Sequence, residues 1–496
     1  MNILSDRFSE IKKASEPLYR TPKSVQETVE ILKISEGGIF EVAEGRYSKT
    51  YRFSDVNYAT RTENEQESFF QKYCKCLNSF DCTFKITVNN KNRDMEALRN
   101  EVMLKYRNDG FDKMRESYNR IIEEKILEGR QGIEQERYLT ITIERKNFEE
   151  AKAQFATIEA SMFRSFAELG SKLTPLTGNE RLKILHDYYR LGREDEFNFD
   201  ISQGRITGTD FRNEICNTRI KYHPDYFEDE GKVGRVLFIK KYPTYLSDRF
   251  FTELTFLPVH SVTSVDVVPV PKDLTMKMLQ KKYLGIESDI IKQQRTRNRN
   301  NDFSSDISYA TRQKKKDIEE IMNNVRENDE SLYYVSVTMI VMADDRDELE
   351  SICETVDSIA KGAGCAVDTC MYKQREAVNT TLPIGVRQIE TMRTMLTQSL
   401  AVLMPFNVQE LCDRNGIYYG VNQISKNIIV GNRKKLLNGN GFIFGVSGAG
   451  KSFQAKMEMG SVLLSTDDNV IAVDPMNGAK RSYLKRVGAI FIKLYA

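Results

Sequence analysis

The sequence GVSGAGKS occupies Gly445 to Ser452 and fits the P-loop pattern G-x4-G-K-[ST] in full. The apolar run Phe442-Ile443-Phe444 precedes it and predicts a short buried strand, and residues 453–464 favour a helix. The motif requires this strand–loop–helix setting. The alternative is a glycine-rich structural turn that precedes a lysine by chance. The complete motif in this setting favours a nucleotide-phosphate-binding loop.

Each residue type in this loop suits phosphate binding. Glycines at 445, 448 and 450 let the backbone curl so that N–H groups point at phosphate oxygens, and the following helix N-terminus adds positive partial charge. We expect Lys451 to act catalytically on the β- and γ-phosphates and the Ser452 hydroxyl to bind Mg²⁺. The predicted ATP site consists of Gly445, Val446, Ser447, Gly448, Ala449, Gly450, Lys451, Ser452 and Phe453.

Hydrolysis of ATP also needs carboxylates, and one candidate follows the loop. Asp474 ends the apolar run Val470 to Val473. It either contacts the Mg²⁺ shell or only marks a second strand, with the catalytic carboxylates further downstream. We favour the second interpretation, because a P-loop fold needs about five parallel strands and few residues remain. We therefore expect a chain that stops inside its motor domain.

Length and composition limit the function classes. The 496 residues predict about three domains, and a net charge of +2 gives no global attraction to nucleic acid or acidic lipid. No signal segment or membrane span is evident, so we expect a cytoplasmic protein, with a peripheral seat on a membrane complex left open. The eight scattered cysteines lack the paired spacing of zinc modules and predict reduced thiols.

The pattern before the motif predicts strand–helix–strand units. Expected strands include 39–42, 47–53, 83–88, 138–143, 234–239, 262–270, 333–342 and 365–372. Expected helices include 63–77, 148–169, 249–254 and 346–360, one or two charged helices in 91–136, and a charged helical stretch 271–328 interrupted near 298–308. No sequence-identical repeat is evident. A link at 379–385 and a helix at 386–404 complete this region.

These elements predict an α/β fold class: N-terminal ferredoxin-like α+β domains with long helices, then the beginning of a RecA-like P-loop NTPase domain. The expected divisions are a tail (1–30), an N-terminal α/β region (31–232), a split ferredoxin-like domain with a helical arm (233–404) and a partial ATPase domain (405–496). We interpret the basic runs 292–299 and 312–316 as solvated helix faces. Contact with DNA phosphates or anionic lipid is the alternative.

Several segments resemble one family, the energising ATPases of type IV secretion and conjugative transfer systems (the fourth VirB protein and its relatives), above all those of Gram-positive type. They are SKLTPLTGNERL (171–182), VLFIKKYPTYLSDRFFTEL (236–254), NTTLPIG (379–385), YYGVNQISKNIIVGNRKKLLNGNGFIFGVSGAGKSF (418–453) and DDNVIAVDP (467–475). They follow the family's order along most of the chain. The departure at Val446, where a small residue or proline is frequent, is minor.

The resemblance implies an N-terminal domain that docks on channel components and a C-terminal domain that hydrolyses ATP. Gly445, Gly450, Lys451 and Ser452 would bind phosphate, and Asp474 would be a second-strand residue. It also implies partners: channel membrane proteins, a coupling ATPase and, when complete, a homo-hexamer, with nucleic-acid contact indirect or weak. The alternatives are a non-catalytic channel-docking module or a DNA-translocating coupling-type ATPase.

Overall fold

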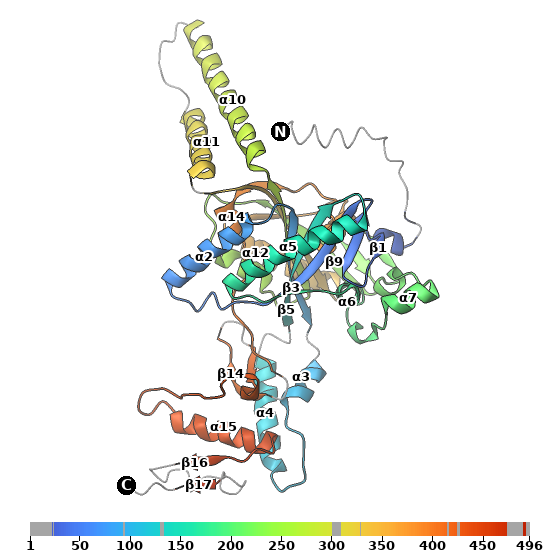
Figure 1. Cartoon of the computed structure of the whole chain (residues 1–496), viewed down its shortest axis with the longest axis vertical. Coiled ribbons are helices and arrows are strands. Elements are labelled where there is room, and N and C mark those ends of the chain that lie inside the picture. Colours follow the sequence, from blue (N-terminus) through green and yellow to red (C-terminus); the bar gives the residue numbers. More distant parts are fainter. Residues whose placement is uncertain are drawn as a thin grey trace.

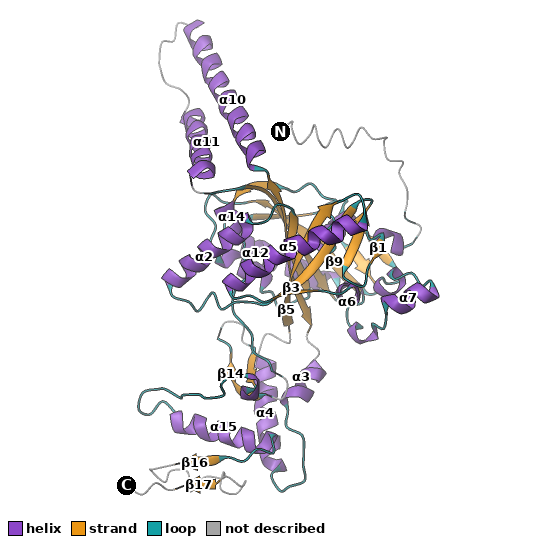
Figure 2. Cartoon of the chain, viewed as in Figure 1, coloured by secondary structure: helices purple, strands orange, loops and turns teal. Residues whose placement is uncertain are grey.

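The computed structural model describes residue 22 and residues 24–92, 95–128, 133–299, 309–327, 329–413, 416–423, 427–473 and 490–492. Over these residues the chain is a mixed α/β protein, and its main body is one large antiparallel sheet with helices on both faces (Figure 1, Figure 2). A helical arm projects from one end of this body. A smaller lobe, which carries the glycine-rich loop, lies at the other end.

The first half of the sheet is built by residues 33–175. Its elements in chain order are β1 (Lys33–Ile34), β2 (Ile39–Ala43), β3 (Arg46–Phe53), α2 (Glu63–Asn78), β4 (Thr83–Asn92), α3 (Met95–Val102), α4 (Asp112–Glu128), β5 (Ile133–Glu144), α5 (Phe148–Leu169) and β6 (Leu173–Pro175). The strand order is β6-β3-β5-β4, and β2 shares with β6 the outer edge of β3.

The second half repeats this plan. Its elements are β7 (Ile220–Tyr222), β8 (Phe227–Asp229), β9 (Lys232–Lys241), α9 (Arg249–Thr255), β10 (Ser261–Val270), α10 (Lys272–Arg299), α11 (Tyr309–Glu327), β11 (Leu332–Ala343), α12 (Arg346–Gly362) and β12 (Ala366–Thr369). The order is β12-β9-β11-β10, and β8 shares with β12 the outer edge of β9. The chain therefore contains a structural duplication.

The two halves join through equivalent strands. β4 pairs antiparallel with β10, and Thr87 lies opposite Ser264 near the middle of this junction. Their hydroxyl oxygens are 2.8 Å apart and hydrogen-bonded in the buried interior. Each half also carries a two-helix insert at the same place, α3–α4 between β4 and β5, and α10–α11 between β10 and β11.

One face of the sheet is apolar. Alternate residues in parts of β4, β5 and β10 and along β11, such as Phe84, Ile141, Val265 and Val337, belong to a single core that also includes side chains of α2, α5, α9 and α12. This alternation is the period of two that a half-buried strand needs. Equivalent caps start two of the covering helices: Asn147 accepts from the Glu150 N–H on α5, and Asp345 accepts from the Glu348 N–H on α12.

The opposite face of the central strands is polar, yet it is also buried. Its members share near-zero exposure and short polar side chains, with one lysine among them: Ser48, Thr50, Lys85, Thr87, Thr140, Ser264 and Thr338. A segment that we call the strap, residues 379–387, lies across them. Its first three residues are the end of α13 (Gln374–Thr381), so the predicted link 379–385 begins as helix. The sequence predicts this region as a link, and the structure buries residues 379–384 completely.

Donors from the sheet face and from α6 (Gly178–Tyr189) satisfy the strap's backbone carbonyls. Lys85 donates to the carbonyls of Thr380, Leu382 and Val386. Arg181 of α6 donates to Pro383 and Ile384 and also to Gly38 and Ser48 of the first half. Burial lowers the pKa of Lys85 to about 8 and that of Arg181 to about 9, so both side chains remain charged donors at neutral pH.

Most predicted elements agree with the structure, but some predictions are wrong. Residues 386–404 form no single helix, because Arg393–Leu396 (β13) pairs with Leu332–Val335 of β11, and only Thr397–Ala401 (α14) is helical. The predicted helical region 91–136 begins and ends as strand, because Asn92 pairs with Ile133 in the β4–β5 ladder. Of the expected tail (1–30), residues 1–21 and residue 23 lie outside the described residues.

We predict that Arg181→Met lowers the free energy of unfolding of the sheet body by about 2–4 kcal/mol, because it leaves buried carbonyls without donors. Urea unfolding followed by circular dichroism would measure this loss. Lys183→Met on the same helix is the matched control, because Lys183 makes a partly exposed ion pair with Asp187 and should change stability by less than about 1 kcal/mol. Equal effects of both variants would contradict the role of Arg181.

Candidate nucleotide site

The nine predicted site residues are contiguous in the structure. Gly445 to Gly450 form an exposed loop, and Lys451, Ser452 and Phe453 form the first turn of α15 (Lys451–Ser465). The Val446 and Phe453 side chains are 79% and 68% exposed. The structure thus places every one of these residues at the N-terminus of a single helix, on the surface of the smaller lobe (Figure 1).

The backbone of the loop explains its glycines. Gly448 and Gly450 have φ values of 82° and 86°, in the left-handed region where a side chain is strained. At Gly445 a Cβ atom would lie 3.3 Å from the Ala449 Cβ and from the Lys451 Cγ, so a close approach selects glycine there. A positive φ therefore accounts for glycine at positions 448 and 450, and a close approach accounts for glycine at position 445.

The start of α15 has the features that a phosphate group needs. Gly450 is its N-cap and supplies no side-chain acceptor, and the first N–H groups of any helix lack partners within the helix. The Lys451 ammonium donates to the carbonyls of Gly445 and Val446 at 2.7 and 2.8 Å, so it folds back over the loop. The Ser452 side chain is exposed on the same turn, where its hydroxyl is free to meet a Mg²⁺–nucleotide complex.

The segment before the loop differs from the prediction. Residues 442–444 form no strand, and Phe442 and Phe444 are 84% and 88% exposed with their rings stacked at 5.9 Å. A buried parallel strand needs hydrogen-bonded neighbours. Among the described residues, the lobe's parallel strands β16 (Ile471–Val473) and β17 (Ile490–Ile492) pair with each other and not with 442–444. Asp474 lies outside the described residues.

A β-hairpin packs against α15, and the basic turn at residues 432–435 follows the second strand of this hairpin. β14 (Ile417–Val421) pairs with β15 (Ile428–Gly431), and the Tyr419 hydroxyl donates to Glu458 of α15 at 3.0 Å. Arg433 forms an ion pair with the same carboxylate at 2.6 Å and lies over the Tyr419 ring. The sequence predicts the basic turn 432–435 but cannot reveal these partners, which are distant in the chain.

Two arginines from the first insert hold the other end of α15. Arg115 of α4, with a side chain that is 1% exposed, donates to the Leu464 carbonyl at 3.2 Å and pairs with Asp109 and Asp112. Arg107 donates to the Ser465 carbonyl at 3.0 Å and pairs with Asp467 at 2.7 Å. Guanidinium groups suit the C-terminus of a helix, because its last carbonyls lack partners and carry partial negative charge.

A small apolar core reinforces this contact between insert and lobe. Leu98 and Val102 of α3 and Ile122 and Ile126 of α4 are buried together with two residues of β15, Ile428 and Val430. The Arg115 guanidinium holds the pKa of Asp109 below its ordinary range, so that this carboxylate stays charged. The α3–α4 insert is therefore a structural part of the lobe that presents the P-loop, although it is encoded more than 300 residues earlier.

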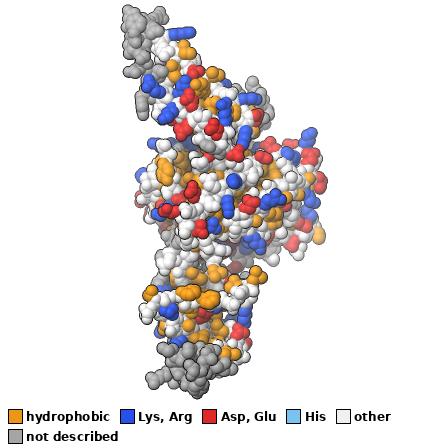
Figure 3. Space-filling model, turned by 60° about the vertical axis from the view of Figure 1, so that its left-hand side comes forward, with side chains coloured by type: hydrophobic (Ala, Val, Ile, Leu, Met, Phe, Trp, Pro, Cys, Tyr) orange, Lys and Arg blue, Asp and Glu red, His pale blue; other side chains and the backbone are white. Residues whose placement is uncertain are grey.

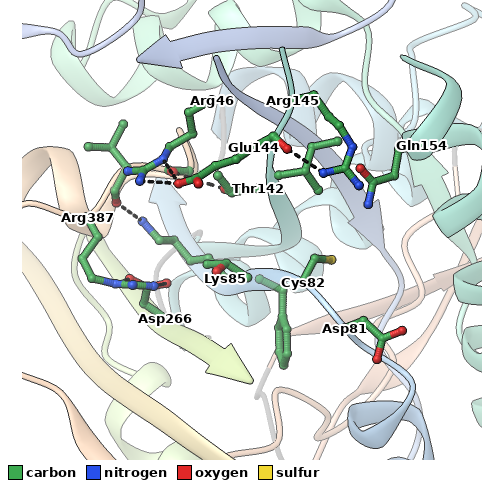
Figure 4. A pocket seen from close by; sticks show the side chains of 15 residues that line it. Arg46, Asp81, Cys82, Lys85, Thr142, Glu144, Arg145, Gln154, Asp266 and Arg387 are labelled. Carbon is green, nitrogen blue, oxygen red and sulfur yellow. Dashed lines mark hydrogen bonds and ion pairs between the residues drawn. The ribbon is translucent and has the colours of Figure 1, made fainter. Parts of the chain in front are cut away.

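One cavity of the sheet body lies elsewhere, at the edge of the polar sheet face. It has a volume of about 430 Å³ and is lined by β4, β5, α5 and the end of the strap (Figure 4). Two ion pairs lie in its lining: Arg387 binds Asp266 with two hydrogen bonds of 2.6 and 2.9 Å, and Arg46 binds Glu144 at 2.7 Å. We interpret this cavity as part of the strap's packing and place the candidate site at the P-loop.

The chain matches no known family model and no curated protein. In the part of the chain that the structure describes, no three His, Cys, Asp or Glu side chains gather as a metal site. Within the same residues no helix is both long and apolar enough to cross a membrane. The loop and the elements that position it are therefore the features from which a function can be inferred.

We predict that Arg115→Ala increases amide hydrogen exchange of α15 about tenfold, because the variant loses a charged hydrogen bond to Leu464 and the packing of a buried side chain. Exchange followed by mass spectrometry would measure this change. Arg107→Ala, which removes a more exposed pair, should have a smaller effect. Unchanged exchange in Arg115→Ala would show that the insert does not hold the helix.

Proposed function

We propose that this chain is the nucleotide-binding part of an ATP-driven motor of a conjugative transfer or type IV secretion apparatus. One observation carries the proposal: a complete G-x4-G-K-S loop whose glycines adopt left-handed or closely packed backbone at the N-terminus of α15. Such an arrangement binds the phosphates of ATP through backbone N–H groups and the lysine. Mg²⁺ would be held by Ser452 together with the phosphates.

The architecture supports the same assignment. Each half of the sheet has the order β-α-β-β-α-β and the strand arrangement 4-1-3-2 of a ferredoxin-like unit. We infer two such units, the first within 31–232 and the second within 233–404. We infer that 405–496 begins a RecA-like domain, because a parallel pair of strands accompanies the P-loop helix. These are the two domain types that the resemblance implies.

The chemistry expected of a complete motor is ATP hydrolysis coupled to transfer of DNA or protein and to channel assembly. In this proposal Lys451 is the catalytic residue at the γ-phosphate, and carboxylates outside the described residues activate water. The partners are channel membrane proteins, a coupling ATPase and, in the complete motor, further copies in a homo-hexamer. The location is the cytoplasmic face of a membrane, with peripheral attachment, and any contact with nucleic acid is indirect.

A second function, assembly without catalysis, is favoured by the share of the chain that builds the sheet. The sheet body and its inserts extend from residue 33 to residue 401, and the glycine-rich loop lies outside them. In this alternative the chain docks on channel proteins whether or not nucleotide is bound. Capture of the same membrane partner by wild type and by Lys451→Ala without nucleotide would support it.

We predict that Lys451→Ala weakens binding of a fluorescent ATP analogue with Mg²⁺ by at least about tenfold, because the variant removes a charged donor to phosphate. Titration of the purified chain would measure the dissociation constant. Lys456→Ala on the same helix is the matched control and should bind like the wild type. Ser452→Ala should lose the enhancement of binding by Mg²⁺.

The proposal fails if the wild-type chain binds no nucleotide, or if Lys451→Ala binds as tightly as the wild type. In cells that depend on the complete protein for transfer, the same substitution is expected to abolish transfer. Transfer at the normal rate in that strain would contradict the motor function.

A further inference from the structure

The two helical inserts occupy equivalent positions but have different surroundings. The α3–α4 insert contacts the lobe, which buries Leu98, Val102, Ile122 and Ile126 against β15, while Ile121 and Leu127 of α4 stay exposed. The α10–α11 insert, which we call the arm, projects away from the sheet on the opposite side of the body (Figure 1). On α10 the side chains of Leu274, Leu284 and Ile291 are 39%, 63% and 48% exposed. Such aliphatic groups on a projecting helix indicate a contact surface.

The exposed aliphatic groups belong to a continuous face of α10. Residues at alternating spacings of four and three align along one side of a helix. On the outer side of α10 these residues, all exposed, are Lys277, Lys281, Leu284, Ser288, Ile291 and Arg295. The opposite side packs on α11: Leu279 is buried there, and Lys315 of α11 pairs with Glu287 at 3.0 Å and lies over Tyr283. From Lys277 to Arg295 this series is basic or aliphatic apart from Ser288, and the exposed acidic residue Asp273 lies one turn before Lys277 on the same side.

The charge of the arm differs from that of the rest of the chain. Helices α10 and α11 contain thirteen Lys and Arg against seven Asp and Glu, whereas the whole chain has 73 against 71. The equivalent α3 and α4 contain five against seven. Among the described residues, Lys277, Lys281 and Arg295 have no ion-pair partner. The excess positive charge is thus concentrated on the insert that projects, and part of it is unneutralised.

We propose that the outer face of α10 docks the protein on an anionic lipid bilayer. Basic side chains are attracted to acidic headgroups, and leucine and isoleucine between them can enter the boundary with the acyl chains. A nucleic-acid duplex would satisfy the charges but would leave Leu284 and Ile291 without an apolar environment. Figure 3 shows basic and apolar side chains together on the arm, and the 28-residue helix offers a contact line of about 40 Å.

This inference extends the membrane location assumed in the proposed function, but its test is independent of nucleotide. Binding to vesicles needs neither ATP nor the P-loop, so Lys451→Ala should bind vesicles as the wild type does. If that variant loses ATP binding and keeps vesicle binding, both proposals are supported. If the wild type binds vesicles but no nucleotide, only the proposed function fails.

The experiment is co-sedimentation of the full chain with vesicles of phosphatidylcholine alone or with about one third phosphatidylglycerol. The wild type should bind the anionic vesicles, with an affinity that falls as salt rises, and should not bind the neutral ones. Lys277→Gln/Lys281→Gln/Arg295→Gln should weaken binding about a hundredfold. Leu284→Ser/Ile291→Ser should weaken it about tenfold.

A matched control removes the same charge from the other insert. Lys105, Lys113 and Arg120 are exposed on or next to α3–α4, and their triple replacement by glutamine should leave vesicle binding unchanged. Circular dichroism would verify that all variants fold. The proposal is overturned if both triple variants lose binding equally, or if the wild type binds neutral vesicles equally well. It is also overturned if the chain binds duplex DNA through the arm's charges, with no effect of the Leu284→Ser/Ile291→Ser change, and ignores vesicles.

Discussion

Burial of the strap's backbone is the constraint on which the rest of the sheet depends. A peptide segment removed from water must find a hydrogen-bond donor for each buried carbonyl. Here the donors come from alternate positions of the central strands and from Arg181, so that face of the sheet must be polar although it is inside the protein. The strap accepts from β3 through Ser48 and from β10 through Ser264. The same few residues therefore tie the two halves together across their junction.

The duplication explains how one scaffold supports two different inserts. In both halves the connection between the second and third strands of the β-α-β-β-α-β order is extended into two helices. The sheet does not constrain these helices, because they leave from strand ends and return to neighbouring strands. The first insert became part of the lobe through Arg107, Arg115 and a small apolar core. The second carries an excess of positive charge. The two inserts thus occupy equivalent positions but differ in the chemistry of their surfaces.

Local patterns predicted much of the fold, and long-range contacts account for what they missed. The P-loop, the helix 148–169 and the arm follow from residue type and spacing within a short window. The prediction of a helix at 386–404 was wrong because pairing with β11 outweighs local helix preference. The prediction of a strand at 442–444 was wrong because an apolar run does not specify which strands it would pair with. Polar alternation in the central strands suggests solvent, whereas the strap covers it. A weak signal of the duplication was present: YLTIT at 138–142 matches YVSVT at 334–338, and Asn147 and Asp345 each precede a glutamate by three residues.

The position of α15 links the nucleotide site to the sheet in mechanical terms. Its first turn faces the phosphate position, and its last carbonyls bond to Arg107 and Arg115. The insert that receives this end departs from β4 and returns to β5, and β4 forms the junction with β10. The last carbonyls of α15 are thus bonded to an insert that leaves from β4, the strand that pairs with β10 at the junction of the two halves.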